Sequence, residues 1–179
     1  TIELLDGSKY PRICLDQCDT VLHHQVVSQV FTYSSNPGPI VYNVSGACLT
    51  VSSDMDEGSG TPALELQPCK AKESTQQWAY SKDGQTLSLA GSPKKCADQD
   101  VSDSRVEMYS CGNGQANQKW AINADGKNHI RQAELKEMCM TPCDDSSSSV
   151  ASSQQRRHRY LQEYRTAMLD GLRSTVTHP

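Results

Sequence analysis

The clearest indication of the fold of this chain is the stretch 118-QKWAINADG-126, because an earlier stretch, 76-QQWAYSKDG-84, repeats it. Both read QxWA-x3-DG, and each tryptophan is preceded by a cysteine nine residues earlier and by a second cysteine further upstream. These are Cys69 and Cys48 in one copy, and Cys111 and Cys96 in the other. Self-similarity of this kind is the signature of a repeat architecture, so the chain contains two units of roughly 40 residues.

A weaker copy of the unit comes first. It contains CLD at residues 14–16, and QVF at residues 29–31 stands where the QxW motif would be. NPG at residues 36–38 replaces its DG turn. A further start, at Cys139, follows the last full unit and has no QxW motif after it. We therefore expect three units, with residues 123–143 either completing the same fold or beginning another.

The segments between these motifs have the pattern of short β-strands and tight turns. Asp-Gly dipeptides favour hairpin turns, and residues 87–89 and 106–108 alternate apolar and polar side chains, as half-buried strands do. A unit this small cannot bury its apolar face alone, whereas three units around a pseudo-threefold axis can. The sequence thus predicts an all-β fold in which Phe31, Trp78 and Trp120 are equivalent core aromatics.

Charge and composition argue against several classes of partner and location. The 179 residues carry a formal net charge of −4, which argues against nucleic acid as a partner. No apolar run approaches the roughly 18 residues of a membrane span. Eight cysteines, an even number, favour disulfide bonds and a secreted or extracellular location over a metal site, because zinc needs closely clustered Cys and His ligands. Asn43-Val44-Ser45 is an N-glycosylation sequon, which agrees with a secreted glycoprotein.

The QxW units with their cysteines resemble the ricin-type (R-type) β-trefoil lectin domain family. The resemblance covers roughly residues 6–122, and extends to 143 if the last segment completes the fold. It implies a β-trefoil with a disulfide inside each full unit, Cys48 to Cys69 and Cys96 to Cys111. For the other four cysteines, pairing within each C-x3-C motif and pairing across from the first unit to the last segment both stay open: Cys14, Cys18, Cys139 and Cys143.

The resemblance also implies a sugar site, and the third copy of the motif meets its three requirements. Asp98 stands two positions after the first cysteine, Tyr109 two positions before the second, and Asn117 directly before Gln118 of the QxW motif. Asp98 and Asn117 would supply acceptors and a donor for sugar hydroxyls, while Tyr109 would offer an apolar ring face to a pyranose. Glu107 stands where the family often has Gln, and an ionised Glu cannot donate a hydrogen bond.

The other copies lack these residues. In the second copy the same positions hold Thr50, Gln67 and Thr75, and the first copy keeps only Asp16. We therefore expect one competent site, which binds galactose-type or N-acetylgalactosamine-type glycans on glycoproteins. The side chains predicted to form it are those of Asp98, Glu107, Tyr109, Asn117 and Gln118.

The predicted function is that of a non-catalytic lectin module in a secreted or surface protein. The sequence has no GxSxG, HExxH or Gly-rich phosphate-loop motif, so we expect no enzyme activity and no cofactor or metal. The alternative is a degenerate trefoil that serves as a structural, protein–protein contact subunit of an extracellular assembly.

The C-terminal part differs in composition from the rest. After a trefoil over residues 1–143, the polar, Ser-rich segment 144–155 reads as a linker. Residues 156–179 then predict an amphipathic helix and tail, because apolar side chains recur at helical spacing from Leu161 to Leu172. A lone helix is marginal in water, so we expect this one to pack on the trefoil, on a protein partner or on chain that this sequence does not include. The alternative function requires the protein partner.

Overall fold

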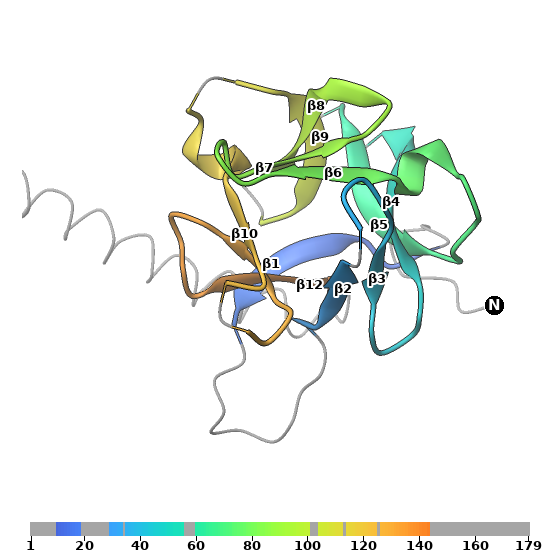
Figure 1. The fold of residues 1–179 in the computed structure, drawn as a ribbon, viewed down its shortest axis with the longest axis horizontal. Coiled ribbons are helices and arrows are strands. Elements are labelled where there is room, and N and C mark those ends of the chain that lie inside the picture. The colour runs from blue at the N-terminus through green and yellow to red at the C-terminus, as the bar shows by residue number, and fades with distance from the viewer. Residues whose placement is uncertain are drawn as a thin grey trace, which may run out of the picture. The chain divides into compact units, whose positions relative to one another are not determined.

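The computed structural model describes residues 10–18, 29–33, 35–55, 60–100, 104–112, 114–124 and 126–143 (Figure 1). All of them belong to the first of the two units into which the chain divides, residues 1–143 and 144–179. The predicted linker and C-terminal helix lie outside the described residues and stay predictions.

The described residues form short strands with two 3-10 turns, which confirms the all-β prediction. The elements are β1 (Ile13–Gln17), β2 (Phe31–Tyr33), β3 (Ile40–Tyr42), β4 (Cys48–Met55), β5 (Pro62–Gln67), η2 (Ser74–Gln76), β6 (Trp78–Ser81), β7 (Thr86–Leu89), β8 (Ser92–Gln99), β9 (Val106–Ser110), η3 (Ala116–Gln118), β10 (Trp120–Ile122), β11 (Ile130–Gln132) and β12 (Met138–Pro142). Within the described part of the chain, no helix is long and apolar enough to cross a membrane.

The strands pair into two antiparallel sheets. One has the order β1-β12-β11-β10, and the other has the order β2-β3-β4-β5-β9-β8-β7-β6. Strands β4–β7 form the second unit and strands β8–β11 the third, each beginning with a hairpin whose first strand pairs with the last strand of the unit before it.

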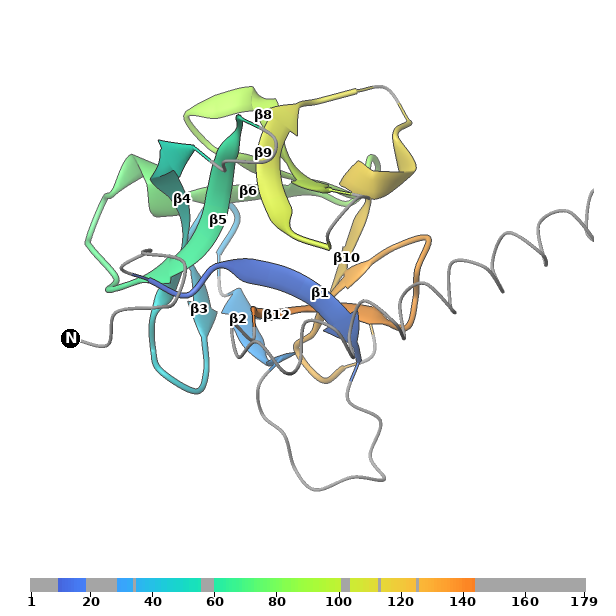
Figure 2. The ribbon, with the colours of Figure 1, turned by 180° about the vertical axis from the view of Figure 1, so that it is seen from behind.

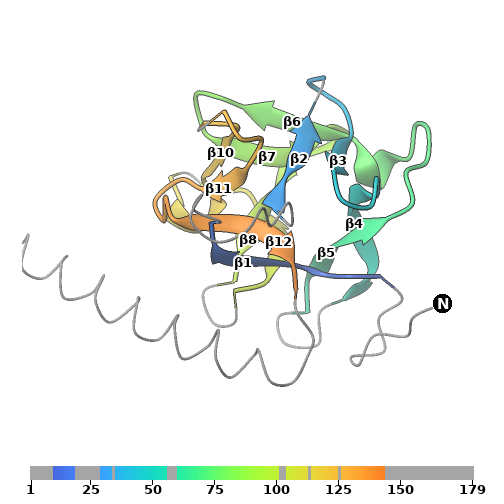
Figure 3. The same ribbon diagram turned by 90° about the horizontal axis from the view of Figure 1, so that it is seen from below.

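The first unit is assembled from both ends of the described chain. β12 pairs with β11, as β8 pairs with β7, so β12 occupies the place of a first strand. β1 pairs with β12, as β9 pairs with β8, so β1 occupies the place of a second strand. Figures 2 and 3 show β1 beside β12, although the two lie at opposite ends of the coloured sequence. Residues 130–143 therefore complete this trefoil, and β2 and β3 supply the rest of its first unit.

The strand register shows the equivalence of the three units. In each, the first-strand cysteine faces the residue two positions before the second-strand cysteine: Cys48 faces Gln67, Cys96 faces Tyr109, and Cys139 faces Asp16. The interpretation of CLD at residues 14–16 as a first strand, with Asp16 in the position of Asp98, was therefore wrong. Asp16 occupies the position of Tyr109, and Thr141 occupies the position of Asp98.

Four disulfides hold the fold. Cys48–Cys69 and Cys96–Cys111 are the pairs implied by the family resemblance, and Cys18–Cys139 is their equivalent in the first unit. Cys14–Cys143 is additional and lies at the end of the β12–β1 pair where hairpin loops join the corresponding strands of the other units. The remaining four cysteines thus pair across, between the first and last strands.

These terminal bridges close long loops. Cys14–Cys143 spans 129 residues and Cys18–Cys139 spans 121, against 15 for Cys96–Cys111. In the loop-entropy estimate, a bridge over roughly 100 residues stabilises by about 4.7 kcal/mol and one over about 15 residues by about 3 kcal/mol. No hairpin connects β1 and β12, so bringing these two strands together costs more chain entropy than closing a hairpin does. The two terminal bridges offset this cost.

The three aromatic residues occupy equivalent places in one core, as predicted. Trp78 and Trp120 are completely buried and Phe31 nearly so. Each donates its backbone N–H across to the preceding unit: Phe31 to Asn128 O at 2.9 Å, Trp78 to Gly38 O at 2.9 Å and Trp120 to Gln85 O at 2.6 Å. The repeated aromatic positions therefore join neighbouring units as well as filling the core.

Candidate carbohydrate-binding site

The candidate site lies on the hairpin of β8 and β9 in the third unit. Asp98 on β8 faces Glu107 on β9, and Cys96 faces Tyr109. Directly opposed residues in an antiparallel pair project to the same face, so Asp98, Glu107 and Tyr109 share one face. Asp98 is buried, whereas the side chain of Tyr109 is 50% exposed. The Cys96–Cys111 disulfide joins the two strands beside this ring.

The 3-10 turn η3 brings two amides to the carboxylate of Asp98. Asn117 Nδ2 donates to Asp98 Oδ1 at 2.6 Å, and Gln118 Nε2 donates to Asp98 Oδ2 at 2.6 Å. Each carboxylate oxygen can accept more than one hydrogen bond. The two amides therefore fix the orientation of Asp98 and leave it able to accept hydrogen bonds from a ligand.

Gln118 lies behind Asp98 and its polar atoms are all engaged. Its Nε2 also donates to Ser110 O at 2.9 Å, and its Oε1 accepts from the Gly112 N–H at 2.8 Å. In the same region, the Trp120 indole N–H donates to Ala97 O at 2.9 Å, next to Asp98. Gln118 therefore holds Asp98 in place, and with only 1% of its surface exposed it has no group to offer a sugar.

Asn117 is also more occupied than the sequence indicated. Besides the bond to Asp98, its Nδ2 donates to Gln99 O at 3.2 Å. A side-chain amide has two hydrogens, so both are used within the protein. The donor that the sequence led us to expect from Asn117 is already engaged, and its Oδ1 is the atom left for a ligand.

Glu107 completes the site and places a second carboxylate beside Asp98. Its Oε2 accepts a hydrogen bond from Thr61 Oγ1 at 2.5 Å. Thr61 precedes β5 in the second unit, so sequence reasoning within the third unit could not identify this contact; only the Ala63–Glu107 pairing of β5 with β9 brings it close.

Electrostatics make Asp98 harder to ionise than an ordinary aspartate. Burial is the largest influence and raises the pKa of Asp98 above its usual value of 3.8. The hydrogen bonds from Gln118 and Asn117 lower the pKa, whereas the nearby carboxylates of Glu107 and Asp100 raise it further. Asp98 is therefore a constrained acceptor in an acidic surrounding.

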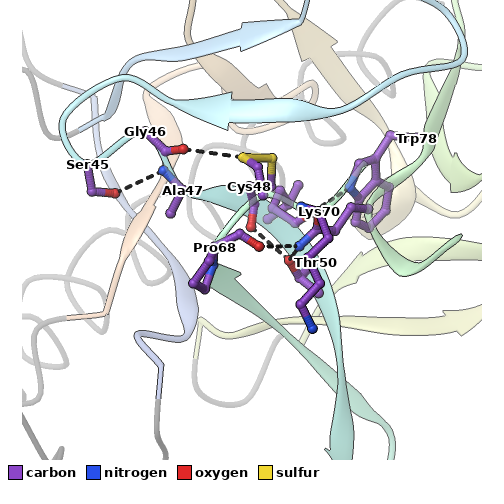
Figure 4. The surroundings of a disulfide bond; sticks show 11 residues. Ser45, Gly46, Ala47, Cys48, Thr50, Pro68, Lys70 and Trp78 are labelled. Atoms are coloured by element: carbon purple, nitrogen blue, oxygen red, sulfur yellow. Dashed lines mark hydrogen bonds between the residues drawn. A yellow bond between two sulfur atoms is a disulfide. The ribbon is translucent and has the colours of Figure 1, made fainter. Parts of the chain in front are cut away.

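The second unit has the same supporting hydrogen bonds without the site (Figure 4). Gln76 Nε2 donates to Thr50 Oγ1 at 3.0 Å and to Pro68 O at 3.1 Å, and Gln76 Oε1 accepts from the Lys70 N–H at 2.8 Å. The Trp78 indole N–H donates to Leu49 O at 2.8 Å. We call this set of bonds, made by the Gln and Trp of each motif, the QxW frame.

The residues that surround the QxW frame differ between the second and third units. Thr50 supplies a hydroxyl in place of a carboxylate, and Gln67 Nε2 donates to Glu65 Oε1 where the third unit has the ring of Tyr109. Thr75 Oγ1 lies 3.4 Å from Glu73 Oε1 and makes no bond to Thr50 among the described residues. The structure therefore brings together Asp98, Glu107, Tyr109, Asn117 and Gln118 in one unit only.

Two further predictions concern the N-glycosylation sequon and metal binding. Asn43 is exposed in the turn after β3, where its Oδ1 accepts from Thr32 Oγ1 at 2.8 Å, so a glycan on it would meet solvent. Among the described residues, no group of three or more His, Cys, Asp or Glu side chains is placed to hold a metal ion.

Comparison with the sequence models of protein families agrees with this architecture. The sequence model of the ricin-type beta-trefoil lectin domain matches residues 37–164, which is more than half of the chain. Among solved structures, a crystal structure of GalNAc-T7 with UDP, GalNAc and Mn2+ matches with 16% identity and a TM-score of 0.41, over 65% of this chain and 21% of that one. This chain thus spans about a fifth of the length of that protein, and a search of the curated proteins finds no match. The family match, together with the repeated QxW frame, shows that the chain belongs to the ricin-type beta-trefoil lectin domain family.

Proposed function

We propose that this chain is a non-catalytic lectin module that binds one sugar residue through its third unit. Membership of the family suggests carbohydrate binding. The observation that carries the proposal is the carboxylate of Asp98, held by Asn117 and Gln118 beside the exposed ring of Tyr109. A carboxylate accepts strong hydrogen bonds from vicinal hydroxyls, and the aromatic ring packs on the apolar face of a pyranose.

The ligand we propose is a terminal galactose or N-acetylgalactosamine on glycans or glycoproteins, as the family resemblance suggests. A single sugar site of this kind binds weakly, near the millimolar affinity that corresponds to about −4 kcal/mol. Useful retention on a surface would then need several sites acting together, either in an oligomer or in a longer protein.

The location that we propose for this function is secreted or extracellular. All the described cysteines are in disulfides, which persist in oxidising compartments and are rare in the cytosol. Glycosylation of Asn43 fits the same location, because its turn is exposed. A structural role, in which the helix predicted after residue 155 docks on a protein partner, is the competing function.

The experiment compares Asp98→Ala with Thr50→Ala on an array of glycans. Both changes remove the side chain that accepts a hydrogen bond from the motif glutamine, but only the first removes a carboxylate. We expect Asp98→Ala to weaken binding at least tenfold, since a hydrogen bond to a charged group contributes about 1.5–3 kcal/mol. Thr50→Ala should bind as the unchanged protein does.

Other outcomes would redirect the proposal. Binding that survives Asp98→Ala would place the sugar elsewhere on the trefoil. A folded, fully disulfide-bonded protein that binds no glycan would instead favour the structural role.

A further inference from the structure

The side chains of the third-unit site leave several hydrogen-bond acceptors, but almost no donors, available to a ligand. Both Nδ2 hydrogens of Asn117 and both Nε2 hydrogens of Gln118 are used inside the protein. The atoms left for a ligand are the oxygens of Asp98, Asn117 Oδ1 and the second oxygen of Glu107. Among the five predicted side chains, only the hydroxyl of Tyr109 retains a hydrogen to donate.

Glu107 is buried, with 7% of its surface exposed, and contributes one acceptor that has no partner among the described residues. Its Oε2 is engaged with Thr61, while its Oε1 accepts no hydrogen bond from the described residues and is not fully buried. In the second unit the equivalent Glu65 is different, because Gln67 donates to its Oε1. Tyr109 stands in the place of Gln67 and has no amide to donate. The substitution that supplies the aromatic ring therefore also leaves Glu107 Oε1 without the hydrogen bond that Glu65 Oε1 accepts.

The charges near the site are mainly negative. Asp98 and Glu107 face each other across the strand pair, and Asp100 also acts on Asp98. Like charges in directly opposed positions destabilise a strand pair. Among the described residues of this strand pair and its ends, the basic side chains are Lys94 and Lys95, at the other end of β8, and Arg105, directly before β9. The carbonyl of Arg105 accepts from the Asp100 N–H. A ligand that brings positive charge would relieve the repulsion between Asp98 and Glu107.

We propose that Glu107 makes this site selective for a hexosamine whose amino group is free. The inference rests on the proposed function and specifies its ligand. A protonated amine offers three donors and no acceptor, which matches an acceptor-rich, anionic site. An N-acetyl group replaces this charge with an amide whose carbonyl is an acceptor, and a sulfate or carboxylate on the sugar adds like charge. The order of preference is galactosamine, then galactose and N-acetylgalactosamine, with sulfated and sialylated sugars rejected.

The test titrates the whole chain with galactosamine, galactose, N-acetylgalactosamine and a sulfated galactose, at a pH where the amine is protonated. We expect galactosamine to bind roughly tenfold more tightly than galactose, as one charged hydrogen bond provides. Glu107→Gln should remove this preference, measured as the ratio of the galactosamine and galactose affinities, and should allow weak binding of the sulfated sugar. The amide oxygen of the variant still accepts from Thr61, so the strand pair keeps this contact. Glu65→Gln, in the second unit, is the matched control and should change none of the affinities.

The outcomes separate this inference from the proposed function. Equal affinity for galactosamine and galactose, or a preference that survives Glu107→Gln, would overturn the selectivity while leaving a lectin that depends on Asp98. Failure of every sugar to bind the folded protein would overturn the proposed function and the selectivity together.

Discussion

The second and third units of this trefoil are built on the same QxW frame but carry different surfaces. In both, a buried glutamine bonds to the first strand, to a carbonyl before the second cysteine and to a backbone N–H after it. In both, a buried indole donates to the residue beside the site position. Of these two units, only the third places a carboxylate at that position and an exposed ring on the same face, opposite the first cysteine.

This difference separates what the frame does from what the site does. The frame bonds are equally complete when the accepting side chain is the hydroxyl of Thr50 or the carboxylate of Asp98. A QxW motif therefore indicates a trefoil unit and does not by itself indicate a sugar site. The proposed site depends on side chains just outside the motif, which can change without loss of the fold.

The largest effect should come from the residues that the two units share. Trp78→Ala and Trp120→Ala each remove a completely buried ring with its indole hydrogen bond. We expect each to lower the free energy of unfolding by about 3–5 kcal/mol, measured by urea denaturation under oxidising conditions. A large cost for one variant and a small cost for the other would contradict the equivalence of the units.

The next effect is the gain of a second site. Thr50→Asp, Gln67→Tyr and Thr75→Asn together give the second unit the residues of the third, on a frame that already holds Gln76 in place. We expect the number of bound sugars per chain to rise from one to two in equilibrium dialysis. The single change Thr50→Asp is the control and should leave one. If the triple variant folds and still binds one sugar, the three positions are not enough to define a site.

A smaller effect should follow from the aromatic ring. Tyr109→Ala removes a half-exposed side chain, so we expect little change in unfolding free energy. We expect a loss of binding of about 0.5–1.5 kcal/mol, which is a factor of roughly 2 to 13 in affinity. Gln67→Ala at the equivalent position of the second unit should leave sugar binding unchanged. Intact affinity of Tyr109→Ala, measured by calorimetry, would show that the ring does not contact the ligand.

The smallest expected effect is a change of stability and of sugar affinity with pH. Because the pKa of Asp98 is raised in the folded protein, the folded state holds this proton more tightly than the unfolded chain does. Stability should therefore fall slightly as pH rises from 3.8 through the raised pKa. Sugar affinity should change in the opposite direction, since a protonated Asp98 loses acceptor capacity. Unfolding and binding measured across this range should show both trends, and Asp98→Asn should lack the stability trend.

The sequence predicted the parts of the fold and site that depend on local motifs. The two QxW copies identified Trp78 and Trp120 as equivalent core residues, and the family resemblance pointed to Asp98, Tyr109 and Asn117. The sequence alone could not predict that β12 supplies the first strand of the first unit, because the pairing of β12 with β1 joins residues more than a hundred positions apart. The engagement of both Asn117 amide hydrogens, and the contact of Thr61 with Glu107, likewise depend on where neighbouring strands end.

The chain contains two tryptophans, and their indole N–H groups report separately on the two units. The Trp120 indole donates to Ala97 O, beside Asp98, and the Trp78 indole donates to Leu49 O, beside Thr50. In a titration of the ¹⁵N-labelled protein with galactose, our account predicts that the Trp120 indole resonance shifts with the sugar while the Trp78 resonance stays in place. A shift of the Trp78 resonance, or sugar binding that leaves the Trp120 resonance unmoved, would contradict a single site in the third unit.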